Sequence, residues 1–399
     1  MKSEFTTKPL SALADIQTGP FGSQLHKEDY VQNGTPIVTV EHLGQKRFTE
    51  QNLPCVSEID KERLNKYILR EGDVVFSRVG SVDRCSYVSR EYNGWMFSGR
   101  CLRVRPCIEI DSQYLYYYFT LESTKQFVRG IATGATMPSI NTKFMGEVPI
   151  AYPPIDEQRK IATVLSALDN KIELNDKINK NLEQQAQAYF NELFVVNAVP
   201  TWSECTLSDI GTIVAGGTPS KSKPEYYAKQ GIAWITPKDL AVDKSKFISR
   251  GANDISELGF SKSSATKMPA GTVLFSSRAP IGYIAIAQNE VTTNQGFKSV
   301  VPNENIGTAY VYFLLKNLLP TIEGMASGST FKEISGTEMK SVPTIMPDMS
   351  TIQRFNIFCE PIFKEQEVLE AENHRLSILR DSLLPKLMSG ELDISDIDL

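Results

Sequence analysis

Two arginines, Arg78 and Arg278, each follow an apolar stretch of similar sequence, at residues 72–77 and 271–277. A guanidinium at the exit of a strand can donate two parallel hydrogen bonds to a phosphate or to the major-groove edge of guanine. A surface salt bridge accounts for either side chain equally well. The sequence leaves these two interpretations open.

Two loops rich in glycine, serine and threonine, residues 130–136 and 324–330, offer a second kind of contact. Their amides and hydroxyls can donate hydrogen bonds to phosphates, and an ordinary surface turn is the equally weighted alternative. The candidate residues in these loops are Thr133, Thr136, Ser327, Ser329 and Thr330. Weaker candidates for base contacts, each better explained individually as a solvated side chain, are Arg84, Arg100, Lys238, Asn294 and Gln295.

Sequence motifs typical of catalysis or metal binding are missing from this chain. The stretch 152–155 reads Tyr-Pro-Pro-Ile and lacks the Asn or Asp that adenine methyltransferases place before the proline pair. Residues 215–221 are rich in glycine but lack the phosphate-loop spacing. The six cysteines form no C-x-x-C pair, and there are only three histidines. We therefore predict no catalytic centre, no metal site and no cofactor, and we expect the cysteines to be reduced.

The composition, 41% hydrophobic and 22% charged over 399 residues, is typical of a globular protein with two or three domains. The net charge of −5 argues weakly against a nucleic-acid partner, because phosphate contacts need lysine and arginine. The acidic excess lies mainly in residues 351–399, so two nearly neutral blocks could each keep one basic face. Because no leader-like start or membrane-length apolar run is present, we expect a cytoplasmic protein.

An internal repeat with a period of about 195 residues organises the chain. Residues 14–19 and 34–43 return as residues 208–216 and 231–240, and residues 71–78 return as 270–278. An aromatic helix at residues 114–129 returns at 310–323, and each copy runs into one of the glycine loops and then a short strand ending at 148–149 or 342–343. The order of these elements predicts two similar α+β domains built on mixed or antiparallel sheet.

Two long stretches with helical spacing of apolar residues follow the two repeats. Residues 155–195 contain no proline or glycine and predict a helix of roughly 60 Å. Its apolar rows are Ile161, Leu168, Leu182 and Tyr189 on one side and Leu165, Ile172, Ala186 and Leu193 on the other. Between them lie Asn175 and Asn179, which either fix the helix register or simply face solvent.

The second long stretch spans residues 351–388, and its repeating residues are Phe355, Phe358, Ile362, Leu369, Leu376, Leu379 and Leu383. Pro361 should kink or restart this helix. We expect the two helices to form an antiparallel coiled coil with a domain at each end, a pseudo-two-fold layout. The expected boundaries are 1–154 and 199–350 for the domains, 155–198 and 351–390 for the helices, and 391–399 for the tail.

With two similar domains, each followed by a long helix, the chain resembles the specificity subunits of type I restriction-modification systems. The most specific marker is the end of the second helix, residues 379–392, which read LRDSLLPKLMSGEL, and residues 153–162, which read PPIDEQRKIA, look equally typical. The resemblance covers essentially the whole chain. The second copy departs from it at residues 346–354, where the double proline and the Glu-Gln pair are missing, so docking at that end could differ in detail.

The resemblance implies that each domain reads one half of an asymmetric, bipartite double-stranded DNA site and that the helices set the gap. It also implies docking of two adenine methyltransferase subunits, which bring S-adenosylmethionine, and recruitment of ATP-dependent restriction subunits. The recognition domains vary within the family, so no base-contacting residue is carried over. Two alternatives remain: a self-contained methyltransferase, which would need the missing cofactor motif, and a coiled-coil adaptor that joins proteins without reading DNA sequence.

Overall fold

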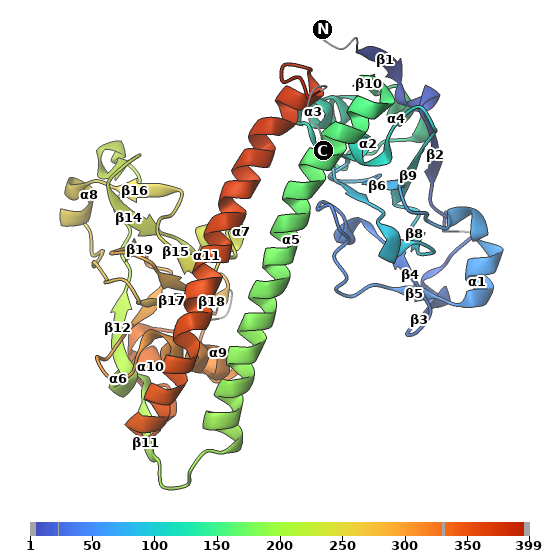
Figure 1. Cartoon of the computed structure of the whole chain (residues 1–399). Helices are drawn as coiled ribbons and strands as arrows, with labels where there is room; N and C mark the ends of the chain where they lie inside the picture. The colour runs from blue at the N-terminus through green and yellow to red at the C-terminus, as the bar shows by residue number, and fades with distance from the viewer. Residues whose placement is uncertain (1–4, 23, 329–331, 395–399) are drawn as a thin grey trace. The chain divides into compact units, whose positions relative to one another are not determined.

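The fold is described from a computed structural model that covers residues 5–22, 24–328 and 332–394. The chain divides into two compact units, Met1–Ile172 with Arg375–Leu399 and Glu173–His374. Each unit contains one α+β domain together with a segment of each of two long helices, α5 (Ile155–Asn191) and α11 (Met349–Met388) (Figure 1).

The first domain is built on two four-stranded sheets, with the strand orders β2-β9-β6-β7 and β3-β5-β4-β8, and a two-stranded sheet β1-β10. Its strands are β1 (Thr6–Pro9), β2 (Ala14–Thr18), β3 (Tyr30–Val31), β4 (Thr35–Val38), β5 (Cys55–Val56), β6 (Val74–Ser77), β7 (Cys85–Tyr87), β8 (Met96–Phe97), β9 (Cys101–Pro106) and β10 (Pro149–Tyr152). Its α-helices are α1 (Glu58–Arg63), α2 (Ser112–Thr120), α3 (Glu122–Ile131) and α4 (Thr142–Gly146). Short 3-10 turns are η1 (Leu10–Ala12), η2 (Lys27–Asp29), η3 (Val40–His42), η4 (Asn65–Tyr67) and η5 (Arg90–Tyr92).

The second domain repeats this topology with the strand orders β12-β20-β17-β18-β15, β13-β16-β14-β19 and β11-β21. Its strands are β11 (Ser203–Thr206), β12 (Gly211–Ala215), β13 (Tyr227–Ala228), β14 (Ile232–Ile235), β15 (Phe247–Ile248), β16 (Asn253–Ile255), β17 (Val273–Ser277), β18 (Ile281–Ala287), β19 (Thr292–Thr293), β20 (Lys298–Pro302) and β21 (Pro343–Met346). Its helices are α6 (Leu207–Ile210), α7 (Pro237–Val242), α8 (Glu257–Ser261), α9 (Thr308–Met325), α10 (Gly336–Lys340) and the 3-10 turn η7 (Pro224–Tyr226). Most strand pairs are antiparallel, and β4-β8, β14-β19 and β15-β18 are parallel. The predicted repeat and its α+β class with mixed sheet are confirmed.

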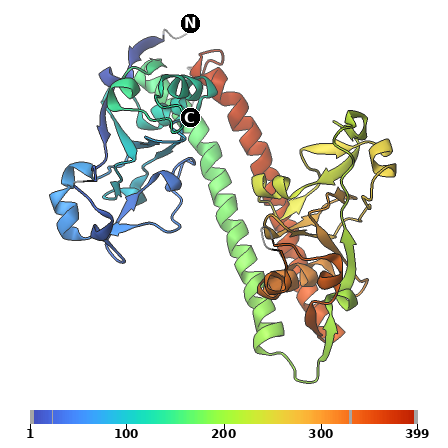
Figure 2. The same ribbon diagram turned by 180° about the vertical axis from the view of Figure 1, so that it is seen from behind.

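The aromatic helix packs against the central strands in both domains. In the first domain the helix predicted at 114–129 is divided at Leu121 into α2 and α3, and Phe119 makes an edge contact of 4.7 Å between ring centroids with Phe76 of β6. In the second domain α9 is continuous, and Phe313 is fully buried. Burying one such ring stabilises the fold by roughly 1.5–3 kcal/mol. Figure 2 shows α9, in orange, against the end of α5.

The two long helices run antiparallel within each unit. In the first unit Asp169 of α5 contacts Arg380 of α11, and Leu165 and Leu387 share one core. In the second unit Asn175 contacts Asn373, and Phe190 contacts Phe355. Residues later in α5 therefore contact residues earlier in α11, as expected for antiparallel helices. A short π-helical turn, η6 (Glu192–Val196), ends α5. The predicted antiparallel coiled coil is confirmed.

Three predictions about the helix seam need correction or refinement. Pro361 lies inside the continuous helix α11 and does not restart it. A proline removes only one backbone donor, and the neighbouring Ile362 packs into the core of the second unit. Phe358 and Leu379, predicted in the seam, are 38% and 45% exposed. Asn175 is fully buried, so the solvent-facing alternative is wrong for this residue.

The seam on α11 includes polar residues that look like surface positions in the sequence. Its members follow a spacing of three and four residues: Ile352, Phe355, Cys359, Ile362, Gln366, Leu369, Asn373, Leu376, Arg380, Leu383 and Leu387. Asn175 donates hydrogen bonds to Glu372 and Asn373, at 2.7 and 2.9 Å, and Gln366 donates to the carbonyl of Asn179 at 3.1 Å. Because a buried amide must be paired, these contacts hold the helices in one register.

Candidate nucleic-acid interface

The structure places three predicted features of the first domain side by side. The amide of Arg78, directly after β6, donates to the carbonyl of Arg100 at 2.8 Å, and the amide of Ile140 donates to the carbonyl of Arg78 at 3.0 Å. Ile140 follows the glycine loop, which is closed by paired backbone bonds between Thr133 and Ser139 at 2.9 and 2.7 Å. Backbone pairing thus joins Arg78, Arg100 and this loop into one cluster.

The two arginine side chains of this cluster are held differently. The Arg78 guanidinium lies 5.2 Å from the ring centroid of Phe21 and donates to the carbonyl of Gly99 at 3.2 Å. The Arg100 side chain is exposed and has no hydrogen bond or ion pair among the described residues. Arg78 is therefore oriented by the protein, whereas Arg100 is free to meet an anion or a base edge. Thr133 and Thr136, in the neighbouring loop, are exposed.

A cleft of about 740 Å³ opens beside these arginines, and the sequence did not predict it. Its lining includes Phe21, Tyr30, Thr39, Glu41, Ser98 and Arg100. The Phe21 ring is 51% exposed and lines this cleft. An exposed ring next to guanidinium groups is suited to contact with bases and sugar-phosphate.

The corresponding cluster of the second domain is built around Arg278. Its guanidinium forms a salt bridge with Glu333 at 3.2 Å, and Lys298 lies 3.6 Å from the same carboxylate. Glu333 closes the second glycine loop through paired backbone bonds with Ser327, at 3.1 and 2.9 Å. Ser327 is exposed, and Ser329 and Thr330 lie outside the described residues.

Hydrogen bonding shows that Arg278 is not the positional counterpart of Arg78. The amide of Ser277 donates to the carbonyl of Gly296 at 2.7 Å, just as that of Arg78 donates to Arg100. Arg278 therefore takes the place of the residue after Arg78, and its side chain leaves the strand on the other face. The repeat in the sequence pairs the two arginines by residue identity, although residues 270–278 are one residue longer than residues 71–78.

The remaining predicted residues make local contacts. Arg84 donates to the carbonyl of Leu43, which turns its side chain back onto the protein. Asn294 accepts the amide of Gly296 at 2.9 Å within its own turn. Gln295 is exposed beside this turn, and its backbone amide donates to the hydroxyl of Thr218 at 3.4 Å. Lys238 is exposed on α7 and lines a separate pocket of about 310 Å³.

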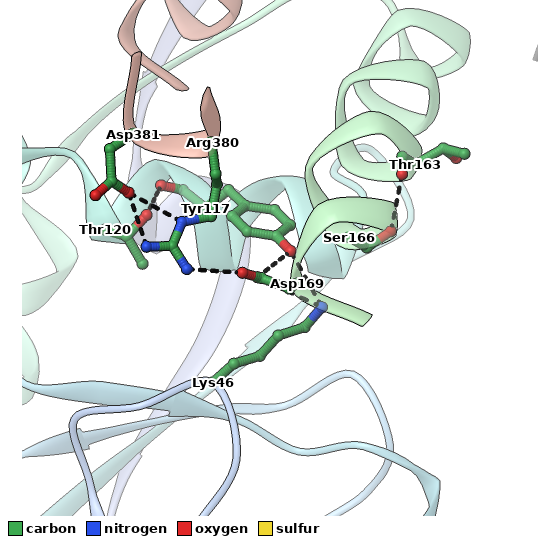
Figure 3. A network of polar contacts seen from close by, with 8 residues as sticks. All are labelled: Lys46, Tyr117, Thr120, Thr163, Ser166, Asp169, Arg380 and Asp381. Atoms are coloured by element: carbon green, nitrogen blue, oxygen red, sulfur yellow. Dashed lines mark hydrogen bonds and ion pairs between the residues drawn. The ribbon is translucent and has the colours of Figure 1, made fainter. Parts of the chain in front are cut away.

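In each unit a lysine that the sequence did not single out contacts a carboxylate of α5. In the first unit Asp169 of α5 accepts hydrogen bonds from Tyr117 at 2.6 Å and from Arg380 of α11 at 2.8 Å, and Lys46 lies 3.8 Å from the same carboxylate (Figure 3). Lys46 also donates to the Tyr117 hydroxyl at 3.1 Å. Burial, reinforced by Asp169, raises the pKa of Tyr117 far above its usual value, so the phenol stays neutral.

In the second unit Lys246 is more deeply buried. Its ammonium contacts Glu183 of α5, donates to Gln366 of α11 at 2.6 Å, and lies 4.2 Å from the ring centroid of Phe363. Burial lowers the pKa of Lys246, while the lysines facing Glu183 outweigh its burial and hold the pKa of this carboxyl below its usual value. The signal in the sequence was the recurrence of Lys46 as Lys246, 200 residues later, close to the repeat period of about 195. The structure shows that the two positions are equivalent, because the carbonyls of both lysines accept equivalent strand amides, at 2.9 and 2.7 Å.

The family model of the type I restriction modification DNA specificity domain matches residues 2–184 and 200–368, which is most of the chain. The chain belongs to this family. The resemblance noted from the helix ends is confirmed. No helix in the described residues is long and apolar enough to cross a membrane. Within the same residues, no three His, Cys, Asp or Glu side chains gather in a way that could hold a metal ion.

Individual specificity subunits match to different extents. The chain is 37% identical over 190 residues to the MjaIX specificity subunit of Methanocaldococcus jannaschii, a match that covers 45% of this chain and 44% of that protein. The match to the HindI specificity subunit of Haemophilus influenzae is 24% identical and covers 82% of this chain and 88% of the relative. A crystal structure of a type I S subunit from M. genitalium has the same fold, with a TM-score of 0.64, 17% identity and coverage of 97% and 96% of the two chains.

Proposed function

We propose that this chain is the DNA-recognition subunit of a type I restriction-modification complex and that each domain reads one half of a bipartite, asymmetric site. The observation that carries the proposal is that an arginine lies beside the glycine loop in both domains, although at positions one residue apart. Arg78 lies beside the loop closed by Ser139, and Arg278 lies beside the loop closed by Glu333. Exposed backbone amides and hydroxyls next to guanidinium groups suit phosphate contacts, which position a protein on DNA.

We propose that exposed side chains next to these clusters contact the bases. In the first domain Arg100 and Phe21 border the cleft, and in the second domain Gln295 is exposed at the corresponding turn. Arginine matches the O6 and N7 atoms of guanine, and glutamine matches the N6 and N7 atoms of adenine. The domains stay close to neutral overall, so contacts to DNA are confined to these faces.

The two long helices are proposed to set the gap between the half-sites and to dock two adenine methyltransferase subunits. Restriction subunits would then join the methylating complex in the cytoplasm. Polar seam pairs such as Asn175 with Asn373 support the first role, because they resist sliding of one helix along the other. Two linked readers bind together only if their separation suits the helical repeat of DNA, about 34 Å per turn. The chain itself is assigned recognition rather than catalysis, and S-adenosylmethionine would be held by the methyltransferase subunits.

Sequencing of modified adenines in the host, with and without this gene, tests the proposal. We expect one bipartite methylation motif to vanish on deletion and to return when the gene is restored. Persistence of every motif after deletion would instead favour an adaptor protein or an inactive subunit. Shortening α5 by four or seven residues should change the length of the gap, whereas an unchanged gap would count against the role of the helices.

A further inference from the structure

Backbone hydrogen bonds identify pairs of equivalent positions on the two DNA-facing clusters. The amide of Ser98 donates to the carbonyl of Val38 at 2.8 Å, and that of Asn294 donates to Ile235 at 3.0 Å. Thr39 follows Val38, and Thr236 follows Ile235. Each threonine caps the start of a short helix, and its carbonyl accepts the amide of the residue three positions later, at 3.1 and 3.0 Å.

This register places Glu41 and Lys238 at the same position of the two domains, two residues after the equivalent threonines. The Glu41 side chain is 70% exposed and lines the cleft together with Arg100. Its carboxylate accepts the Thr39 hydroxyl at 3.1 Å and lies 3.9 Å from His42. The position therefore carries a negative group in one domain and a positive group in the other.

Lys238 is exposed on the first turn of α7 and forms no ion pair among the described residues. The adjoining Pro237 lies against the turn that carries Gln295, since a Cβ added to Gly296 would meet the proline ring at 3.0 Å. Glu41 thus lines the cleft together with Arg100, and the residue before Lys238 touches the turn that carries Gln295. Lys238 itself lines the pocket beside α7.

We infer that Glu41 and Lys238 are specificity-determining residues, Glu41 for cytosine in one half-site and Lys238 for guanine in the other. A carboxylate can only accept hydrogen bonds, and in the major groove the N4 amino group of cytosine supplies the donor. An ammonium can only donate, and the O6 and N7 atoms of guanine accept. A carboxylate aimed at phosphates would be repelled, so base contact is the productive use of Glu41 on this face. The inference rests on the proposed function.

The test uses a host strain in which the gene is replaced by single variants, followed by sequencing of modified adenines. Glu41→Ala should relax one cytosine position in one half of the motif, and Lys238→Ala should relax one guanine position in the other half. The preference for the correct base should fall roughly 5- to 150-fold at that position. Glu41→Gln keeps an acceptor oxygen and should retain part of the preference for cytosine.

Matched controls are Glu62→Ala on α1 and Lys262→Ala after α8, which remove the same charges from exposed positions that line neither the cleft nor the pocket of Lys238. Both controls should leave the motif unchanged. Unchanged motifs in Glu41→Ala and Lys238→Ala, relaxation in the same half, or loss of all methylation would each overturn the inference. A wild-type strain without any bipartite motif would instead refute the proposed function itself.

Discussion

The two domains resemble each other where they meet the long helices and differ where their loops are exposed. Lys46 and Lys246 occupy equivalent positions and lie over the equivalent rings of Tyr117 and Phe313, at 5.3 and 5.6 Å. In both units one carboxylate lies between two cations, but it comes from a different residue: Asp169 in the first unit and Glu183 in the second. The mode of attachment is therefore shared.

The exposed loops, in contrast, differ in charge at several equivalent positions. Arg100 corresponds to Gly296, Ser139 to Glu333, and Glu41 to Lys238, as the backbone bonds show. An identical pair of readers would specify a symmetric site. The difference indicates that the repeat preserves attachment to the helices while each domain has its own recognition surface.

The largest expected effect is the loss of stability on replacing Lys246, compared with Lys46. Lys246 is 6% exposed, so Lys246→Met leaves Glu183 with one cation fewer in a buried site, and we expect the second unit to lose roughly 2–4 kcal/mol of stability. Lys46 is 22% exposed, and Lys46→Met should cost only about 0.5–1 kcal/mol in the first unit. Urea unfolding followed by hydrogen exchange in each unit measures both losses. Lys364→Met, at an exposed position of α11, is the control, and equal losses in the two units would contradict the account.

A smaller difference is expected between the arginines on DNA. Arg78 has no carboxylate partner among the described residues, so Arg78→Ala should weaken binding by about 1–2 kcal/mol and lower the salt slope by about one. Arg278 must leave Glu333 to reach DNA, so Arg278→Ala should cost less than about 1 kcal/mol. Binding is measured by titration of a duplex that carries the methylated motif, at several salt concentrations, with the host methyltransferase present.

The Glu333→Gln variant tests whether the Glu333 carboxylate competes with DNA for Arg278. It removes a negative charge next to Arg278 and Lys298, so it should tighten DNA binding. Weaker binding by Glu333→Gln would show that the salt bridge supports the loop rather than competing with DNA.

The smallest effect concerns how the two long helices begin. Helix α5 follows two prolines, and its neutral Gln158 donates to the carbonyl of Pro153 at 2.9 Å. Helix α11 follows Asp348, whose carboxylate accepts the Ser350 hydroxyl and the Thr351 amide, and these bonds lower its pKa to about 2. A lowered folded-state pKa stabilises above pH 3.8, the ordinary value, and this stabilisation is lost as the pH falls through about 2.

Fluorescence reports this titration, because the Trp202 indole donates to Asp348 at 3.3 Å. We expect a small change in tryptophan emission between pH 4 and pH 2 that is absent from Asp348→Ala and from Trp202→Phe. The same change in either variant would place its origin elsewhere.

The periodic parts of this fold were predictable from the sequence, and the long-range contacts were not. Apolar spacing predicted the two long helices, and the domain between them in the sequence predicted their antiparallel pairing. Turn glycines with apolar runs located the central strands. Gln366, Asn373 and Arg380 read as surface residues because their partners on α5 are about 190–210 residues away in sequence. The sequence indicated the candidate arginines and loops, whereas the cleft beside Phe21 depends on how separate loops pack. The one-residue offset of Arg278 corresponds to the extra residue in 270–278 relative to 71–78, and hydrogen bonding shows that the extra residue comes before Arg278.

Sequencing of modified adenines in hosts that carry Arg100→Gln or Gln295→Ala tests whether each domain reads its own half-site. We expect Arg100→Gln to relax a base position in one half of the motif and Gln295→Ala to relax a position in the other half only. Relaxation of the same half by both variants, or motifs identical to the wild type in both strains, would contradict this expectation.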